Sequence, residues 1–144
     1  MDFKLFLEQS EEQKDIKSTL ARIPKKHRAL LRGFKIKMLN GNVLKNDKEH
    51  IGYMDDEKKE IVITAPWAYS KQHLFLHECG HVVYKTLSKE LKQKWKKIVD
   101  NTTKPRVHQG YEEAFCHSYA STYCKRPHSI HDHKEWEEFI RSLP

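Results

Sequence analysis

Two histidines stand four residues apart in the stretch HLFLHECGHVVY, which covers residues 73–84. Because an α-helix has about 3.6 residues per turn, His77 and His81 project from the same helix face on successive turns, and their imidazole nitrogens can hold one tetrahedral metal ion. Gly80 leaves that helix without a side chain beside the two histidines, which lets another helix approach closely. The stretch therefore predicts a helix that packs against a second element.

Glu78 directly follows the first histidine, so the motif is HExxH. On a helix its side chain points about 100° away from His77, beside the expected ion rather than onto it. There its carboxylate can take a proton from a metal-bound water molecule. The alternative is a pair of structural histidines, but the motif lies in an amphipathic helix directly after an expected hairpin, and this context favours a Zn²⁺ site.

A catalytic zinc site needs a third protein ligand. The metzincin continuation HExxHxxGxxH is absent, because Tyr84 and Leu87 occupy the positions of its glycine and third histidine. Glu112 and Glu113 stand 31 and 32 residues after His81, at the start of the helical stretch YEEAFCHSYA. A carboxylate there reaches the ion if the two helices pack together, and Glu113 is the expected third ligand.

The same stretch indicates how its helix faces the core. Phe115 and Tyr119 lie four residues apart and are expected to pack inside. His117 follows Glu113 by one turn on the same face, which suits a contact with a metal-bound histidine or with the Glu113 carboxylate. An ordinary histidine at the edge of the core is the alternative.

The remaining patterns predict an α+β chain, with two helices before a small three-stranded sheet and only helices after it. Pro24 begins the second helix and Gly33 ends it. The expected strands are 33–39 and the two arms of a hairpin at 51–65, with a loop at 40–50. Further helices are expected within 66–87 and at 89–101, 111–124 and 133–143.

The length of 144 residues suits one domain with one core. No apolar run is long enough to span a membrane and the first residues lack the pattern of a secretory signal, so a cytoplasmic location without membrane contact is expected, with export by another route left open. The three cysteines fit no disulfide framework and are expected to be reduced. The net charge of +7 can attract nucleic acid or an acidic partner, but a solvated lysine face is the more ordinary interpretation.

Three features together resemble the gluzincin catalytic domain of the anthrax lethal factor and Pro-Pro endopeptidase family: HECGH after a hairpin, a helix from Ser88 that contains Trp95, and EEAFCHSYA. The resemblance covers roughly residues 23–143. In that family the ligand helix usually reads EFFAE from the third ligand. Here EAFCH places Glu113 on the ligand and His117 in place of the second acid.

The resemblance implies a single zincin-like metallopeptidase domain over residues 1–144, made of N-terminal helices (1–32), a small sheet (33–65), and the HExxH helix with a helical part (66–144). Its activity would be that of a zinc metalloendopeptidase, which hydrolyses a protein or peptide with a zinc-bound water activated by Glu78. The substrate would lie as an extended strand against an edge of the sheet. The family also keeps a tyrosine before the ligand helix to stabilise the oxyanion, and the loop KPRVHQGY offers His108, the preferred residue, and Tyr111 for this role.

Other interpretations stay open. The ImmA and IrrE proteases, which act on DNA-binding repressors, also pair HExxH with a downstream glutamate helix. In a SprT-like protease acting on DNA-associated proteins, a histidine such as His108 would be the third ligand. Outside enzymes, the chain could be a binding module whose zinc is structural.

Cysteine and histidine residues near the motif offer rival metal ligands. Cys79 lies inside HECGH and Cys116 stands close to Glu113. On a helix Cys79 faces away from the two histidines, so it is expected to pack in the core. The cluster HSIHDH at residues 128–133 is expected to be solvated rather than to form a second metal site.

Overall fold

Two short helices precede the sheet in the computed structural model, which describes residues 11–39, 43–45, 48–50, 52–64, 71–102, 110–124 and 134–144. They are α2 (Glu11–Leu20) and α3 (Lys25–Leu30), and Pro24 is the residue before α3, as predicted. Gly33 has a φ of 87°, a left-handed conformation that glycine adopts without strain, and it turns the chain into the first strand. Four apolar residues of this segment are buried: Ile16, Leu20, Ile23 and Leu31.

A three-stranded sheet follows, with the strand order β1-β5-β4. Its strands are β1 (Lys35–Leu39), β4 (Gly52–Asp55) and β5 (Glu60–Thr64). β4 and β5 are antiparallel, which confirms the predicted hairpin, whereas β1 runs parallel to β5. Because β5 is central, consecutive residues on both of its faces are covered, and Ile61, Val62 and Ile63 are all buried. The α+β class and the small sheet are therefore as expected.

The hairpin reverses through local side-chain chemistry. The Asp55 carboxylate accepts hydrogen bonds from the backbone N–H groups of Glu57 and Lys58, each at 3.1 Å. Lys59 has a φ of 52° at the end of the turn. An aspartate that caps its own turn is a common way to stabilise such a reversal.

The prediction of a loop at residues 40–50 was wrong. Within this segment β2 (Val43–Lys45) pairs antiparallel with β3 (Lys48–His50) in a separate two-stranded sheet. Each strand has only three residues and carries charged side chains, so no alternating apolar pattern marks it in the sequence.

Four helices make up the rest of the described chain: α4 (Lys71–Thr86), α5 (Lys89–Thr102), α6 (Tyr111–Tyr123) and α7 (Lys134–Ser142). All four lie within one or two residues of the predicted positions, except that α4 begins later within its predicted range. The Ser88 hydroxyl accepts a hydrogen bond from the Leu91 N–H at 3.2 Å and so caps the start of α5.

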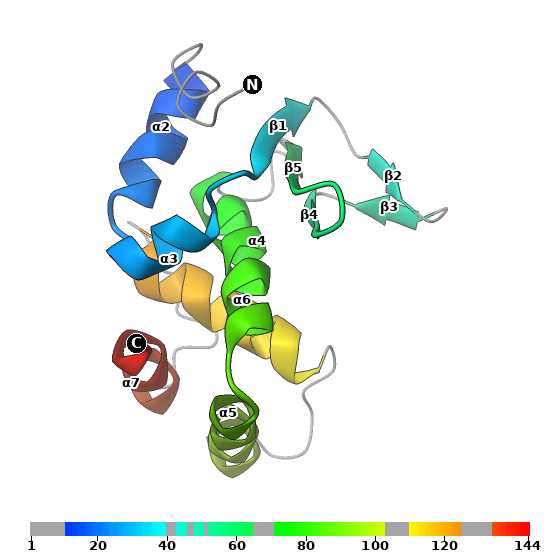
Figure 1. Ribbon diagram of the computed structural model, residues 1–144. Coiled ribbons are helices and arrows are strands. Elements are labelled where there is room, and N and C mark those ends of the chain that lie inside the picture. The colour runs from blue at the N-terminus through cyan, green and yellow to red at the C-terminus, as the bar shows by residue number, and fades with distance from the viewer. Residues whose placement is uncertain are drawn as a thin grey trace.

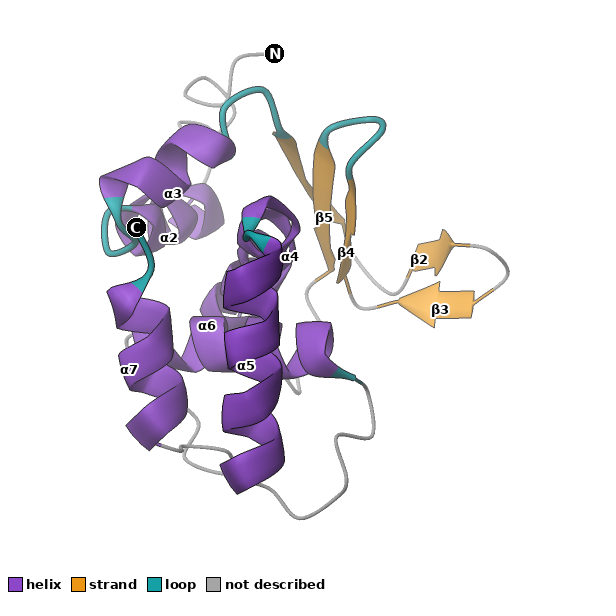
Figure 2. Ribbon diagram, turned by 60° about the horizontal axis from the view of Figure 1, so that its bottom comes forward, coloured by secondary structure: helices purple, strands orange, loops and turns teal. Residues whose placement is uncertain are grey.

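Helix α4 lies between the sheet and α6, as the two ribbon views show (Figures 1 and 2). On the sheet side the approach is close, because a Cβ added to Gly52 of β4 would lie 3.3 Å from the Leu74 side chain of α4. Both faces of α4 are therefore covered, which explains why most of its residues from position 73 onward are buried. The HExxH motif thus lies at the centre of the molecule rather than on a free helix.

An aromatic cluster joins α5, α6 and α7, and it consists of Trp95, Phe115, Trp136 and Phe139. Ring centroids within the cluster lie 5.2 to 6.5 Å apart. Both indole N–H groups have acceptors: Trp95 donates to the Tyr111 carbonyl at 2.8 Å, and Trp136 donates to the Thr102 hydroxyl at 2.6 Å. The cluster ties three helices together and fixes the first residue of α6.

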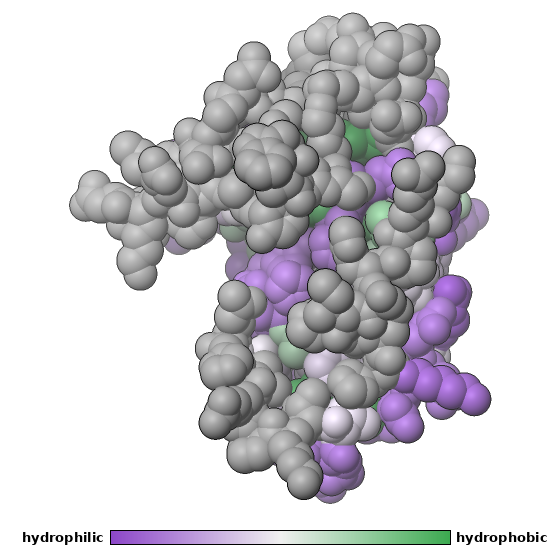
Figure 3. All heavy atoms as spheres, turned by 180° about the vertical axis from the view of Figure 1, so that it is seen from behind, coloured by the Kyte–Doolittle hydropathy of each residue, from purple (hydrophilic) through white to green (hydrophobic). Residues whose placement is uncertain are grey.

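The surface of the described residues is mainly hydrophilic on the side opposite to Figure 1, with apolar residues visible only in small areas (Figure 3). Among the described helices, none has both the length and the apolar character that a membrane crossing requires.

Candidate metal centre

The candidate centre lies where α4 and α6 touch. A Cβ added to Gly80 of α4 would lie 2.9 Å from the Cα of Cys116 and 3.3 Å from its Sγ, so the two helices approach to a distance that only glycine permits. The prediction that Gly80 lets a helix come close is confirmed. The helices run in roughly opposite directions here, since His81 meets the start of α6 while His77 also meets His117, one turn further along.

Three predicted ligands meet across this contact. The Nε2 atom of His77 lies 2.9 Å from Glu113 Oε2, and the Nε2 atom of His81 lies 3.1 Å from Glu113 Oε1. Each oxygen of the Glu113 carboxylate therefore faces the Nε2 atom of one of the two imidazoles. The structure brings His77, His81 and Glu113 together as the sequence predicted.

The donor set and its spacing fit Zn²⁺. Two histidines and a glutamate are one of the ligand sets of catalytic zinc, with metal–ligand bonds of about 2.0–2.2 Å. Two ligand atoms on one tetrahedral ion at such bond lengths are separated by about 3.3 Å. The two distances between imidazole and carboxylate are slightly shorter than this value, so a small outward movement of the Glu113 side chain, which is 32% exposed, makes room for an ion.

Glu112 occupies a position that the sequence did not reveal. Its Oε2 atom lies 2.6 Å from Nδ1 of His81, the ring nitrogen that does not face Glu113. A carboxylate at this distance is a charge-assisted hydrogen-bond acceptor for an Nδ1–H donor. The available signal was the pair of consecutive glutamates at the start of the helix, which point about 100° apart and can reach different atoms.

The charges of the centre shift the pKa values of its members in opposite directions. Burial by itself lowers the pKa of His81, but the hydrogen bonds to Glu113 and Glu112 and the nearby charge of Glu78 outweigh it and raise the pKa of His81 to about 9. Hydrogen bonds from His77 and His81 hold the pKa of the Glu113 carboxyl well below its usual range. Both carboxylates also lie in the first turn of α6, where the helix dipole favours negative charge.

Glu78 is buried beside the centre, with 4% of its surface exposed. Its negative charge contributes to the raised pKa of His81. The pKa of the Cys116 thiol is raised by burial first and then by the surrounding carboxylates, among them Glu78. As the residue that follows His77 on α4, Glu78 projects from a helix face different from that of the two histidines.

Each of the two helices carries one further histidine: His117 on α6 and His73 on α4. The ring of His117 lies 4.5 Å from the ring of His77, measured between centroids, and 6.1 Å from the ring of His73. His73 precedes His77 by four residues and is buried, and this spacing was a readable signal of a third histidine on the same face of α4. His117 is also a possible donor to a metal, in a group with His77 and Glu113.

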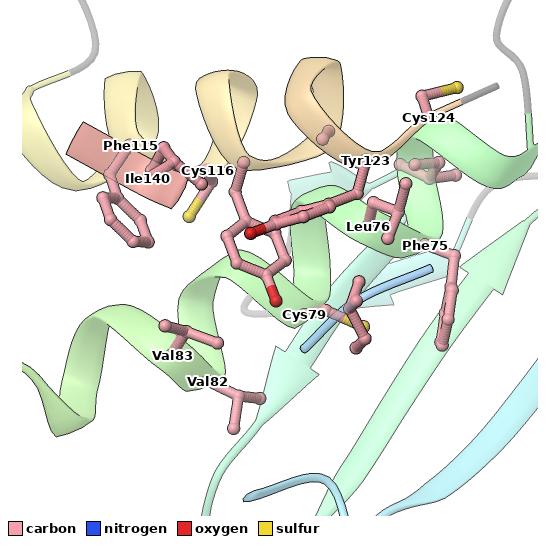
Figure 4. Close-up of a cluster of buried hydrophobic side chains, with 14 of the residues drawn as sticks. Phe75, Leu76, Cys79, Val82, Val83, Phe115, Cys116, Tyr123, Cys124 and Ile140 are labelled. Atoms are coloured by element: carbon pink, nitrogen blue, oxygen red, sulfur yellow. The ribbon is translucent and has the colours of Figure 1, made fainter. Parts of the chain in front are cut away.

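The cysteines divide between the core and the centre. Figure 4 shows Cys116 projecting from α6 toward α4, whereas Cys79 lies toward the strands. Cys116 forms a second possible donor group with His77 and His81, in which the ligand atoms lie within 4.8 Å of one another. Cys79 is fully buried in the hydrophobic core, as predicted, and all three cysteines are free thiols.

The predicted oxyanion residues have different outcomes. His108 lies outside the described residues, and so do the histidines of the cluster at 128–133. Tyr111 is described: its hydroxyl donates to Asp100 Oδ1 at 2.7 Å, and Lys96 Nζ lies 5.4 Å from its ring centroid. Tyr111 thus stands beside Glu112 with its hydroxyl directed at α5.

Comparisons with protein-family models, with curated proteins and with solved structures find no match to this chain.

Proposed function

We propose that the protein is a zinc-dependent metallopeptidase with a zincin-like arrangement of the gluzincin type. The observation that supports this proposal most directly is the meeting of His77 Nε2 and His81 Nε2 on the two oxygens of Glu113, at 2.9 and 3.1 Å. Glu78 adds a buried carboxylate beside this set. A structural zinc site has no need of such a base, whereas hydrolysis does.

Each residue has a defined task in this proposal. His77, His81 and Glu113 would hold the ion, and the ion would supply Lewis-acid polarisation of the scissile carbonyl and of a water molecule. Glu78 accepts the proton of that water and passes it to the leaving amine. The substrate is a protein or peptide in extended form, and β4, which forms one edge of the sheet and contacts α4, is the edge strand proposed to receive it.

The free thiols support a cytoplasmic setting as part of this proposal. Cys79, Cys116 and Cys124 are free and buried, and reduced cysteines of this kind are typical of the cytoplasm. We therefore place the activity in the cytoplasm.

Metal analysis combined with a peptide-library digest tests the proposal. The purified protein is expected to hold one zinc per chain and to cleave a subset of the library, and the chelated protein is expected to cleave none. The Glu78→Gln variant serves as the inactive control and Glu57→Gln, an exposed turn residue, as the active one. A protein without bound zinc, or cleavage by Glu78→Gln at the wild-type rate, excludes this mechanism.

Cys116 supports a second candidate function, that of a binding module with structural zinc. Its Sγ lies within 4.8 Å of the donor nitrogens of His77 and His81, so a thiolate there can complete a closed set of four protein ligands. Substitution of zinc by Co²⁺ separates the two functions. A sulfur-to-metal charge-transfer band that disappears in Cys116→Ser, in a protein that cleaves no peptide, would favour the binding module.

A further inference from the structure

The imidazole of His81 lies between two consecutive carboxylates. Glu113 Oε1 is 3.1 Å from Nε2, and Glu112 Oε2 is 2.6 Å from Nδ1. The imidazole is largely buried, with 16% of the side chain exposed, while the Glu112 side chain is 40% exposed. The ring therefore has one oxygen at each of its nitrogens, and both oxygens come from the first turn of α6.

The backbone of α6 holds Glu112 in this position. The carbonyl of Tyr111, the residue before it, accepts the indole hydrogen bond of Trp95 at 2.8 Å, and Trp95 is fully buried. On the other side of the contact, Gly80 sets the closest approach of α4 to α6 at Cys116, one turn further along. The spacing between Glu112 and His81 is thus fixed by packing at two points rather than by the ion pair alone.

We propose that Glu112 is a positioning residue that holds the Nδ1–H group of His81, so that Nε2 is the nitrogen presented to the metal. This inference rests on the proposed function. An ionised carboxylate can only accept a hydrogen bond, so the contact requires a hydrogen on Nδ1. In the metal-free protein Nε2 also carries a hydrogen, which faces Glu113. On metal binding that hydrogen would be released, and an imidazole that keeps its hydrogen on Nδ1 has its lone pair on Nε2.

The arrangement assigns different tasks to two neighbouring glutamates. Glu113 reaches the Nε2 atoms of both histidines and is placed as a ligand. Glu112 touches the far nitrogen of one histidine and fixes its tautomer and ring direction. The main effect of Glu112 is expected on metal binding, because its contact orients the imidazole of a proposed ligand.

Zinc affinity tests the inference when it is measured by chelator competition in four proteins: wild type, Glu112→Ala, Glu112→Gln and Glu138→Gln. Glu138 is an exposed glutamate of α7, a helix that carries none of the proposed ligands, and its carboxylate lies 3.9 Å from Lys134, so it controls for the loss of one charge. Loss of an outer contact to a metal-binding histidine typically weakens metal binding about 10- to 100-fold, and this loss is expected for Glu112→Ala. Glu112→Gln keeps an acceptor oxygen without the charge and is expected to lose less.

Nitrogen-15 and proton NMR of the histidine rings supply a readout that a purely structural role would not change. In the zinc-loaded wild type, His81 is expected to show a slowly exchanging Nδ1–H proton, shifted downfield by its carboxylate acceptor. In Glu112→Ala this signal is expected to exchange with water or move upfield, while the His77 signals stay the same.

The outcomes separate the two proposals. A wild-type protein that binds no zinc overturns the proposed function and this inference with it. Zinc binding by the wild type, with unchanged affinity and an unchanged Nδ1–H signal in Glu112→Ala, overturns only the positioning role of Glu112.

Discussion

The Cα of Cys116 lies 2.9 Å from the place where a Cβ on residue 80 would be, so Gly80 and Cys116 fix how closely α4 and α6 approach. Side chains of ordinary size would hold the two helices further apart. The distances of 2.9 and 3.1 Å between the imidazoles of α4 and the carboxylate of Glu113 depend on this approach. A glycine inside the HExxH motif therefore determines the spacing of the candidate metal ligands through the helix packing.

Gly80→Ala is expected to destabilise the protein by about 1–3 kcal/mol, the usual cost of overpacking, because the neighbour that must move is backbone. The same displacement moves Glu113 away from the histidines, so zinc affinity falls as well. Urea unfolding and chelator competition measure the two effects. Lys85→Ala, at an exposed position of the same helix, is the control, and equal behaviour of the two variants would contradict the packing account.

Glu78→Gln is expected to keep the fold and the bound zinc and to lose peptidase activity. The amide fills the same space but cannot accept the proton of the attacking water, and general base catalysis is worth roughly 10²- to 10⁴-fold in rate. Turnover of the cleaved library peptide and zinc content are measured on the same sample. Activity near that of the wild type would remove Glu78 from the mechanism.

Glu113→Ala is expected to weaken zinc binding more than either Glu112→Ala or His108→Ala. Glu113 is placed to bond the ion, whereas an outer residue only orients a ligand, at a cost of about 10- to 100-fold. Chelator competition ranks the three variants. If His108→Ala showed the greatest loss, a histidine from the segment before α6 would replace Glu113 as the third ligand.

His108→Ala is expected to lower turnover by about 10²- to 10³-fold, the usual effect of removing one oxyanion donor, while zinc content stays unchanged. Tyr111→Phe is the matched variant, and its effect is expected to be smaller because the Tyr111 hydroxyl donates to Asp100 at 2.7 Å. A large loss in Tyr111→Phe beside normal turnover in His108→Ala would transfer the role to the tyrosine. Normal turnover in both variants would leave neither residue as the donor.

His27 predicts a pH dependence of stability that is separate from the metal centre. It is buried, its Nδ1 lies 2.9 Å from the Tyr119 hydroxyl, and burial lowers its pKa from 6.5 against the opposing effect of a backbone hydrogen bond to Pro144. The unfolded chain therefore binds more protons than the folded one below about pH 6.5, and the free energy of unfolding decreases as the pH falls through this range.

Urea unfolding of the zinc-free protein between pH 5 and pH 8 measures this effect, with conditions chosen to bracket the ordinary pKa of 6.5. His27→Gln is expected to lose less stability over the acidic part of the range than the wild type. In the zinc-free protein His81 acts in the opposite sense, because its raised pKa gives stability that is lost as the pH rises through about 9. Both the wild type and His27→Gln contain His81, so its contribution cancels when their free energies of unfolding are subtracted. If the free energy of unfolding depended on pH identically in the two proteins, His27 would not titrate as proposed.

The helices and the hairpin were predictable because their signals are local. The HExxH helix follows from the spacing of its histidines, and the hairpin follows from turn residues such as Asp55. The parallel pairing of Lys35 with Glu60 depends on tertiary structure and has no local signal. The short strands of the second sheet were missed because three residues are too few to show a period.

In the candidate site too, some residues have a local signal in the sequence and others depend on tertiary structure. Spacing alone indicated His77 and His81 and the region of the third ligand. Which nitrogen each glutamate would meet depends on the angle and distance between α4 and α6, and the sequence states neither, so the contact of Glu112 with Nδ1 of His81 was missed. His73 could have been found from its spacing of four residues before His77.

The aromatic cluster of α5, α6 and α7 has a consequence for the cost of binding an ion. Closely packed protein interiors resist gradual deformation. The indole of the buried Trp95 donates a hydrogen bond to the carbonyl of Tyr111, the residue that precedes the two glutamates. The backbone that carries both carboxylates is thus ordered when the chain folds, and only side-chain freedom remains to be lost on binding. The candidate centre is therefore preorganised. A flexible loop would lose backbone entropy when it binds an ion, whereas here that entropy is lost when the chain folds and Trp95 packs against Phe115.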